Sequence, residues 1–565
     1  MDSGDLLVRG GTVVDGTGAP SYEADVRVRS GKIAEVGPGL RPDGEPEVDA
    51  GGALVTPGFI EPHTHYDGSL WWDPHIDPMP SHGTTSVVLA NCGLGLAPLR
   101  EADRNQLIEL MCFIEDLPTD AFETAIPWTW ETWPEYQAAN DGHPTALNVA
   151  AFFPHQTLRM WVMGAEAWER AATEAERAEM AQMLDEGLAA GAFGLSTSLM
   201  DLDRHNRLVP SRMADDQEWG DLLDVVAAHP GATFQFVPRA FEFEHFPGDM
   251  ERMAALCRDR GIRANWGGFF AQENRAKERQ ISLELVDQLN AEGGQIATLY
   301  SVRPSYVNLH FERSIMWSGV EAWHELCNVD GDEAKMAMLR DEGWRERARH
   351  DWDACTYTLA PINRPHMILL ASDEPRNAEW AGRSIADLAD ARGVHLSDAV
   401  ADWLLDNNMG THLKTQPQPV DNETLAEMAR LPMTVNGASD AGAHIQMFVG
   451  AGDATFFLTE MVRERGLLTI EEAVHSVTGK QAAFFGISGR GAVAEGMAAD
   501  LAVFALNEID LGDEVRVDDL PTGSWRYSRK PAGYRATVVN GVPTWADDRS
   551  TGALPGAFLR NGAVG

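Results

Sequence analysis

Short apolar runs with polar turns between them divide the chain into a central region and two flanking regions. Residues 5–50 alternate β-rich runs with Gly-Gly, Asp-Gly and Gly-Lys turns, and the same texture returns at residues 491–507 and 534–544. The last of these contains an Asn-Gly pair, which is a strong hairpin signal. Because so few strands do not close a core alone, we expect one small β-sandwich built from both chain ends, residues 1–53 and 491–565.

Between the flanks, residues 54–490 alternate strand-like apolar runs with amphipathic segments of helical length, such as residues 174–190. This alternation is typical of a parallel α/β fold. We therefore expect a (β/α)8 TIM-like barrel, although about nine runs qualify as strands where eight are needed, so one assignment is expected to be wrong. The candidate strands are 54–60, 84–90, 147–152, 192–197, 233–237, 262–266, 295–300, 367–371 and 433–436.

Two long stretches interrupt this alternation. Residues 104–143 contain the aromatic run from Trp128 to Tyr136, and residues 303–350 hold Tyr306 and several tryptophans. Insertions after barrel strands lie at the catalytic face and form lids or binding walls. Their aromatic content indicates either an apolar part in a substrate or packing of the insertions against each other.

Composition narrows the possible partners. The 565 residues are 44% hydrophobic and 23% charged, as in globular proteins. Acidic residues outnumber basic ones by 86 to 45, for a formal net charge of −41. Such a surface repels phosphates and anionic lipid, so we expect neither a nucleic acid nor a membrane partner. The first residues carry no targeting pattern and no run approaches a membrane span, which favours a cytoplasmic protein. Whether it forms a homo-oligomer stays open.

The pair His63 and His65 is the first candidate for chemistry. It directly follows an apolar run from Ala53 to Ile60. Alternate side chains of a strand point to the same side, so both imidazoles can converge on one point. Two neutral imidazoles there suit a zinc-like ion. From spacing alone, a polar loop whose histidines only contact water is the alternative.

Two further residues end apolar runs in the same way. Cys92 follows the run 84–90 within Asn-Cys-Gly, and a thiolate binds zinc strongly, whereas an inert buried cysteine is the alternative. The five cysteines are scattered without a Cys-x-x-Cys pair, which argues against a disulfide framework. Asp440 follows the run 433–436, where a carboxylate can ligate a metal and transfer a proton.

Taken together, these motifs resemble the amidohydrolase superfamily. They are His-Thr-His at 63–65, Ser-His-Gly-Thr-Thr-Ser at 81–86, Asn-Cys-Gly at 91–93, Gly-Leu-Ser-Thr-Ser at 194–198, Ser-Asp-Ala-Gly at 439–442 and Ala-Ala-Asp-Leu at 498–501. Asn-Cys-Gly after the second strand narrows the resemblance to the N-acyl-D-amino-acid deacylase (D-aminoacylase) branch. The resemblance implies a (β/α)8 barrel on a terminal β-sandwich, a zinc site, and hydrolysis of an amide by metal-activated water.

The resemblance also implies roles for individual residues. His63, His65 and Cys92 match metal ligands, and Asp440 matches a ligand that is also the catalytic acid/base. The family adds one histidine from each of strands five and six, but residues 231–237 and 261–268 contain none. Gln235 and Asn265 are poor zinc ligands. We therefore expect one zinc ion, or another divalent metal, with recruitment of another histidine as the alternative. The candidates for recruitment are His205, His245, His310 and His366.

The expected function is hydrolysis of a C–N amide bond in an N-acylated amino acid or a related small molecule. A cyclic amide, a carbamate or a lactone as substrate, or an inactive barrel that only binds a ligand, are the alternatives. A substrate carboxylate would favour an arginine partner. The candidate substrate-binding residues are Arg204, Arg239, Arg303 and Tyr306.

Overall fold

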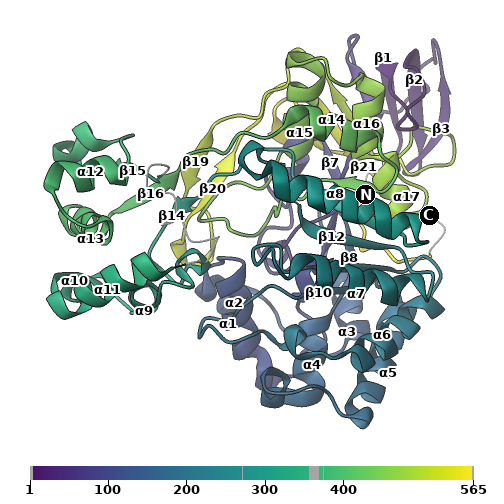
Figure 1. Ribbon diagram of the computed structural model, residues 1–565. Coiled ribbons are helices and arrows are strands. Elements are labelled where there is room, and N and C mark those ends of the chain that lie inside the picture. The colour runs from purple at the N-terminus through teal and green to yellow at the C-terminus, as the bar shows by residue number, and fades with distance from the viewer. Residues whose placement is uncertain (1–3, 270, 356–367, 373, 563–565) are drawn as a thin grey trace.

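The computed structural model describes residues 4–269, 271–355, 368–372 and 374–562 (Figure 1). Strands from both chain ends share one nine-stranded sheet in the order β23-β22-β21-β18-β5-β1-β2-β3, with β4 paired to β1. These strands are β1 (Leu6–Val13), β2 (Tyr22–Arg29), β3 (Lys32–Gly37), β4 (Glu47–Asp49), β5 (Leu54–Pro57), β18 (Leu501–Phe504), β21 (Tyr534–Val539), β22 (Val542–Ala546) and β23 (Arg549–Ser550). The pairing of β5 with β18 therefore joins the two ends.

Parallel strands make up the centre of the molecule. A three-stranded sheet runs β6-β7-β8, and a six-stranded sheet runs β17-β13-β12-β11-β10-β9. Their bounds are β6 (Phe59–Glu61), β7 (Thr84–Leu89), β8 (Asn148–Ala151), β9 (Phe153–Pro154), β10 (Gly194–Ser198), β11 (Thr233–Val237), β12 (Ala264–Phe269), β13 (Ile296–Tyr300) and β17 (Thr434–Asn436). The mixed α/β class and the neighbour order agree with the prediction from the apolar runs.

Helices follow the parallel strands from β9 to β17 along the chain and cover their outer side (Figure 1). They are α4 (His155–Met163), α5 (Glu174–Ala190), α6 (Asp216–Ala228), α7 (Phe246–Arg258), α8 (Ala276–Ala291), α14 (Asn422–Arg430), α15 (Asp453–Phe457), α16 (Ile470–Val477) and α17 (Gly479–Phe485). Helix α5 begins at a Thr173 to Glu176 capping box and ends at Gly191, which has a left-handed conformation. Local capping and an apolar stripe thus fix the helix where the sequence predicts one.

The predicted first strand, residues 54–60, is two strands. Its first half, β5, pairs antiparallel with β18 in the terminal sheet, and its second half, β6, pairs parallel with β7. Gly58 separates them, and a Cβ there would lie 2.0 Å from Thr85 Cγ2, so a larger residue does not fit. The apolar run is continuous because both halves are buried, one in each sheet.

The predicted strand 367–371 does not belong to the parallel set. Its described part is β15 (Ile368–Ser372), which pairs antiparallel with β16 (Thr411–Thr415), and β16 also pairs with β14 (Asn308–Leu309). The periodicity of the sequence cannot distinguish a strand of the parallel set from a strand of a separate antiparallel sheet, because a buried strand is apolar in both.

That small sheet belongs to an insertion with its own core. It contains α9 (Glu321–Cys327), α10 (Asp332–Arg340), α11 (Glu342–Ala354), α12 (Ile385–Arg392) and α13 (Leu396–Asp406), and stands to the left of the parallel strands in Figure 1. Its aromatic rings stack on each other, with centroids 4.9 Å apart for Phe311 and Trp317 and 5.2 Å apart for Trp317 and Trp323. These rings therefore form the core of the insertion, which agrees with the alternative that the aromatic residues pack against each other.

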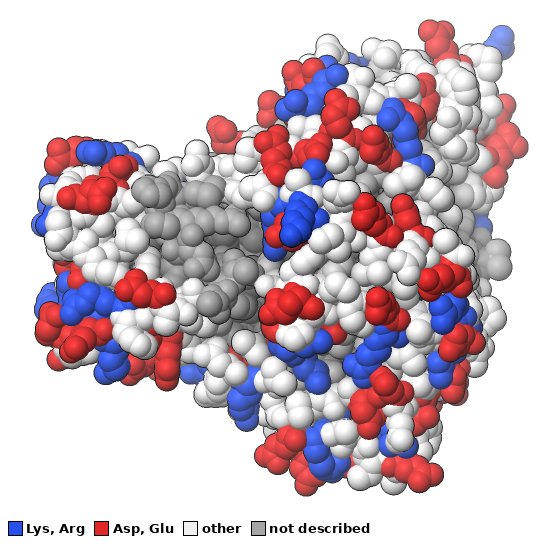
Figure 2. Space-filling view, in the orientation of Figure 1, with Lys and Arg blue, Asp and Glu red and all other residues white. Residues whose placement is uncertain are grey.

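The earlier insertion forms α1 (Arg104–Ile114), α2 (Thr119–Ala125) and α3 (Trp133–Asp141), and a hairpin of β19 (Glu514–Val517) and β20 (Arg526–Arg529) reaches toward the second insertion. Figure 2 shows acidic side chains spread over the visible face with basic ones among them, so the negative charge is not gathered into one patch there. In the described part of the chain, no helix combines the length and apolar character that crossing a bilayer requires.

Asp500, in the Ala-Ala-Asp-Leu motif, joins the terminal sheet to the parallel strands. Its carboxylate accepts hydrogen bonds from Asn148 Nδ2 on β8 at 3.0 Å and from the Asn540 N–H at 2.8 Å, and it pairs with Arg490. The side chain is buried. Removing one partner of a buried, paired charge leaves the other uncompensated.

We therefore expect Asp500→Ala to lower the free energy of unfolding by about 3–5 kcal/mol. Urea denaturation followed by circular dichroism measures this change. The control, Glu495→Ala, removes an exposed carboxylate five residues earlier on the chain and should change stability by less than about 0.5 kcal/mol. Equal effects of the two substitutions would refute the joining role.

Candidate metal centre

Three potential metal ligands meet where the first parallel strands end. His63 and His65 follow β6, and Cys92 follows β7. Cys92 Sγ lies 3.4 Å from His63 Nε2 and 4.0 Å from His65 Nε2. One ligand atom from each residue falls within 4.8 Å of the others. The convergence predicted from the alternation of a strand is therefore present in the structure.

Asp440 approaches the same point from the end of β17. Its Oδ1 lies 3.2 Å from His63 Nε2 and 3.8 Å from His65 Nε2. The backbone pins this approach, because the His65 N–H donates to the Ala441 carbonyl at 2.8 Å and Thr64 forms a parallel bridge with Ala441. The first and last parallel strands thus bring their polar ends together.

The surroundings favour the protonation states in which His65 and Asp440 can bind a metal ion, which are the neutral imidazole and the ionised carboxylate. Burial, helped by the neighbouring His63, lowers the pKa of His65 to about 3, so its ring is neutral. Burial alone would raise the pKa of Asp440, but the contacts with His63 and His65 outweigh it and lower that pKa below its usual range. Burial and then the carboxylates of Glu115 and Asp201 raise the pKa of the Cys92 thiol.

The donor set fits a zinc-type ion. Two imidazoles, one sulfur and one carboxylate are the ligand types that zinc takes in proteins. The Nε2 atoms of both histidines face Sγ and Oδ1, while both buried Nδ1 atoms have no hydrogen-bond partner among the described residues. A dication would also favour the Cys92 thiolate that burial opposes.

Among the described residues, the surroundings of Gly267 beside His63 are apolar. A Cβ on Gly267 would lie 3.8 Å from His63 Cε1, 3.8 Å from Val237 and 3.9 Å from Leu299. Gln235 and Asn265 are fully buried and do not line the cavity in the part of the chain that the structure describes. Neither amide therefore replaces an imidazole beside the ion site.

The alternative histidines lie elsewhere. His310 pairs with Asp116 at 2.8 Å, and His205 and His245 are exposed. None of these three lines the cavity, and His366 lies outside the described residues. The structure therefore does not place any of these three described histidines beside the candidate ligands.

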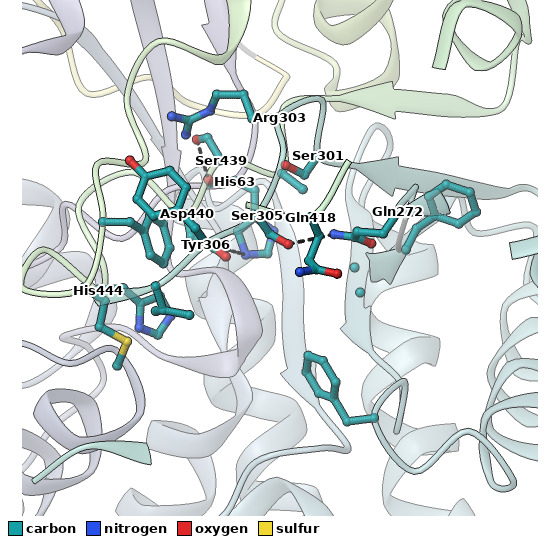
Figure 3. A pocket seen from close by; sticks show the side chains of 18 of the residues that line it. His63, Gln272, Ser301, Arg303, Ser305, Tyr306, Gln418, Ser439, Asp440 and His444 are labelled. Atoms are coloured by element: carbon teal, nitrogen blue, oxygen red, sulfur yellow. Dashed lines mark hydrogen bonds and ion pairs between the residues drawn. The ribbon is translucent and has the colours of Figure 1, made fainter. Parts of the chain in front are cut away.

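The ligands lie in a cavity of about 580 Å³. In Figure 3, His63, Asp440 and His444 lie on one side and Gln272 and Gln418 on the other. The apolar part of the wall is formed by several elements, including the second insertion. Its apolar residues are Ile114, Met200, Val237, Phe241, Phe269, Leu299, Val307, Ile315, Met316, Ile368, Met447, Phe448 and Val449.

Of the predicted substrate-binding residues, the structure brings two to this cavity. Arg303 and Tyr306 line it, but both are engaged: Arg303 pairs with Asp453 and donates to the carbonyls of residues 449 and 450, and the Tyr306 hydroxyl donates to Glu514 at 2.5 Å. Arg303 thus holds the loop after β17.

Arg204 and Arg239 are not brought to the cavity. Arg204 pairs with Glu109 at 2.7 Å, and Arg239 pairs with Asp249 at 2.7 Å. Neither is part of the cavity lining. The structure therefore does not bring these two predicted residues to the site, because a loop position after a strand does not fix where a long side chain points and each guanidinium group pairs with a carboxylate elsewhere.

Sequence reasoning missed Glu115 and His444. The Glu115 carboxylate lies 3.5 Å from His65 Nδ1 and 3.6 Å from His444 Nε2, and both residues line the cavity. Glu115 ends the first helix of an insertion, and no motif marks it. His444 follows Asp440 by four positions, which was the one available signal.

Comparisons with known proteins agree with this geometry. A family model described as "Amidohydrolase family" matches residues 46–305 and 382–545, and the unmatched stretch between falls in the second insertion. The chain is 28% identical to N-acyl-D-aspartate deacylase of Alcaligenes xylosoxydans xylosoxydans, covering 99% of this chain and 95% of that protein. It is 27% identical to D-aminoacylase of the same organism, covering 99% and 98%.

Solved structures of D-aminoacylase have the same fold. One of them, 25% identical, superposes with a TM-score of 0.67 over 98% of this chain and 99% of that one. That protein has a binuclear metal centre with one-metal activation and second-metal attenuation. A crystal structure of D-aminoacylase, also 25% identical with a TM-score of 0.67, covers the same shares of both chains.

We expect Glu115→Gln to weaken zinc binding by about 10- to 100-fold, because the carboxylate beside Nδ1 orients the His65 ring and makes it more basic. Competition with a chromophoric chelator measures the dissociation constant. Glu278→Gln is the matched control, since Glu278 lines the same cavity without a contact to a ligand residue. Unchanged affinity in Glu115→Gln would exclude the orienting role.

Metal affinity should also rise with pH. The raised pKa keeps the Cys92 thiol protonated without an ion, and binding requires the thiolate, so binding releases a proton and weakens as pH falls. Titration calorimetry in two buffers of different ionisation enthalpy counts the released protons. Cys92→Ser should release fewer, and an affinity independent of pH would rule out Cys92 as a ligand.

Proposed function

The chain belongs to the amidohydrolase family, and on that premise we propose that it is a metal-dependent hydrolase of the C–N amide bond in N-acyl-D-amino acids. The observation that supports this proposal most strongly is that His63, His65, Cys92 and Asp440 converge in the wall of one cavity. The similarity to N-acyl-D-aspartate deacylase and D-aminoacylase over nearly the whole chain supports this substrate class.

We propose one zinc ion per chain, held by His63, His65, Cys92 and Asp440. When bound, such an ion polarises a carbonyl oxygen and lowers the pKa of water to about 7. The apolar surroundings at Val237, Gly267 and Leu299 support a single ion, because they supply no donor atom on that side of His63.

Asp440 is the proposed proton carrier. Its lowered pKa keeps the carboxylate ionised, so it accepts the proton of the attacking water and then passes it to the departing nitrogen. Its side chain is 39% exposed toward the cavity, which allows contact with both water and substrate. Glu115 lies beside the proposed ligand His65 and holds its ring in place.

The fold proposal is a closed (β/α)8 barrel of residues 54–490 with a β-sandwich from residues 1–53 and 491–565. Its support is the parallel order of β6 to β17 and the bridge from Thr64 to Ala441, which links the last strand to the first. A barrel places the carboxyl ends of all strands at one face, where a site can form.

The two halves of the cavity suggest how the substrate lies. The apolar wall fits an acyl chain. Ser305, Gln272 and Gln418 form the polar part opposite the ligands, where the Gln272 amide donates to Ser305 Oγ at 3.0 Å. We propose that the amino-acid moiety of the substrate is held by these residues and by Tyr306. We also propose that the substrate is a small molecule and that the reaction takes place in the cytoplasm.

We expect Asp440→Asn to lower kcat/KM for N-acyl-D-amino acids by about 10²- to 10⁴-fold while the fold remains, because the proton carrier is lost. A panel of N-acetyl D- and L-amino acids, assayed by amine release, measures turnover and the preference for the D form. Asp513→Asn, an exposed carboxylate, is the control. Turnover unchanged in Asp440→Asn, or retained after complete metal removal, would contradict the proposal.

A further inference from the structure

The turn that carries Cys92 has an unusual backbone. Cys92 has φ +58°, Ala90 has φ +56° and Gly93 has φ +74°. Residues other than glycine rarely adopt this left-handed conformation and keep it only where their surroundings determine it. The position of the Cys92 sulfur therefore depends on whatever holds this turn.

Three side chains, from the start of α4 and from the middle of β10 and β11, hold it. The Cys92 N–H donates to Gln235 Oε1 on β11 at 2.8 Å, and Gln156, in the first turn of α4, donates to the Cys92 carbonyl at 3.4 Å. Ser196 on β10 accepts from the Gly93 N–H at 3.1 Å. The shortest of these bonds is the one that Gln235 makes, and it is made to the ligand residue itself.

The contact of the Gln235 side chain with the proposed metal centre is the bond to the Cys92 backbone. Its side chain is fully buried and does not line the cavity, and its Nε2 has no hydrogen-bond partner among the described residues. Its one described hydrogen bond is thus the bond to the Cys92 N–H. A buried polar side chain costs free energy unless it is hydrogen-bonded, and the bond to the Cys92 N–H offsets part of that cost for Gln235.

Asn265 provides a matched comparison. It is the register partner of Gln235 on β12, is equally buried, and has an amide with no hydrogen-bond partner in the described part of the chain. The two side chains share location, burial and amide chemistry. They differ in that Gln235 holds the Cys92 turn and Asn265 does not.

We propose that Gln235 is a positioning residue of the metal centre, which fixes the Cys92 sulfur beside His63 by holding the Cys92 backbone N–H. Strand β11 thereby contributes through a hydrogen bond to a ligand residue in place of a ligand atom. The inference rests on the proposed metal centre and is independent of the proposed substrate.

The test replaces Gln235 by methionine, which has similar length and no amide oxygen. Purified full-length variants are loaded with Co²⁺, whose charge-transfer absorption reports a bound thiolate, and zinc affinity is measured by chelator competition. We expect Gln235→Met to weaken the charge-transfer band toward that of Cys92→Ala and to weaken zinc binding about 10-fold or more. Gln235→Glu, which keeps an acceptor oxygen, should retain the band at saturating Co²⁺.

Asn265→Leu controls for loss of a buried amide. The proposal requires that this variant keep both the band and the affinity while circular dichroism shows all variants folded. An intact band in Gln235→Met, or equal losses in Gln235→Met and Asn265→Leu, would overturn it. A wild-type band without any deacylase activity would leave the positioning role supported and refute only the proposed function, whereas a wild-type protein without the band would refute the positioning role.

Discussion

The site depends on the pairing of two chain segments that are far apart in sequence. The His65 N–H donates to the Ala441 carbonyl at 2.8 Å, so the end of β6 and the end of β17 are held together. Parallel strands present their carboxyl ends at one edge. Without this pairing, Asp440 would not lie beside His63 and His65.

This arrangement brings several acidic groups together in buried positions, which is electrostatically unfavourable. Burial raises the pKa of Glu115 and of the Cys92 thiol, and the Asp440 and Asp201 carboxylates raise both further. The contacts with His63 and His65 lower the pKa of Asp440, but they do not offset the repulsion at Cys92 and Glu115. A bound dication does, because it stabilises the thiolate and the carboxylate together. The residues therefore suit an ion that completes the structure as well as the chemistry.

The metal centre is asymmetric around His63. Polar groups approach from the ends of β6, β7 and β17, whereas Val237, Gly267 and Leu299 bound the other side. The strands on that side contribute indirectly, since Gln235 holds the backbone of Cys92. A single ion can thus be supported by strands that supply no ligand atom.

The sequence by itself determined the family, most of the order of elements and the four candidate ligands that the structure brings together. His63, His65, Cys92 and Asp440 each follow an apolar run, and strand alternation is a local property that a sequence records directly. It also located the aromatic insertions, but not whether their rings pack together or meet a substrate.

Only the tertiary structure decided the rest. It divided residues 54–60 at Gly58 and placed 368–372 in a separate sheet, because burial looks the same in either sheet. It paired Arg204 with Glu109 and Arg239 with Asp249, and it brought Glu115 beside His65. Long side chains make these contacts between residues 10 to 95 positions apart, and no spacing along the chain encodes where such side chains meet.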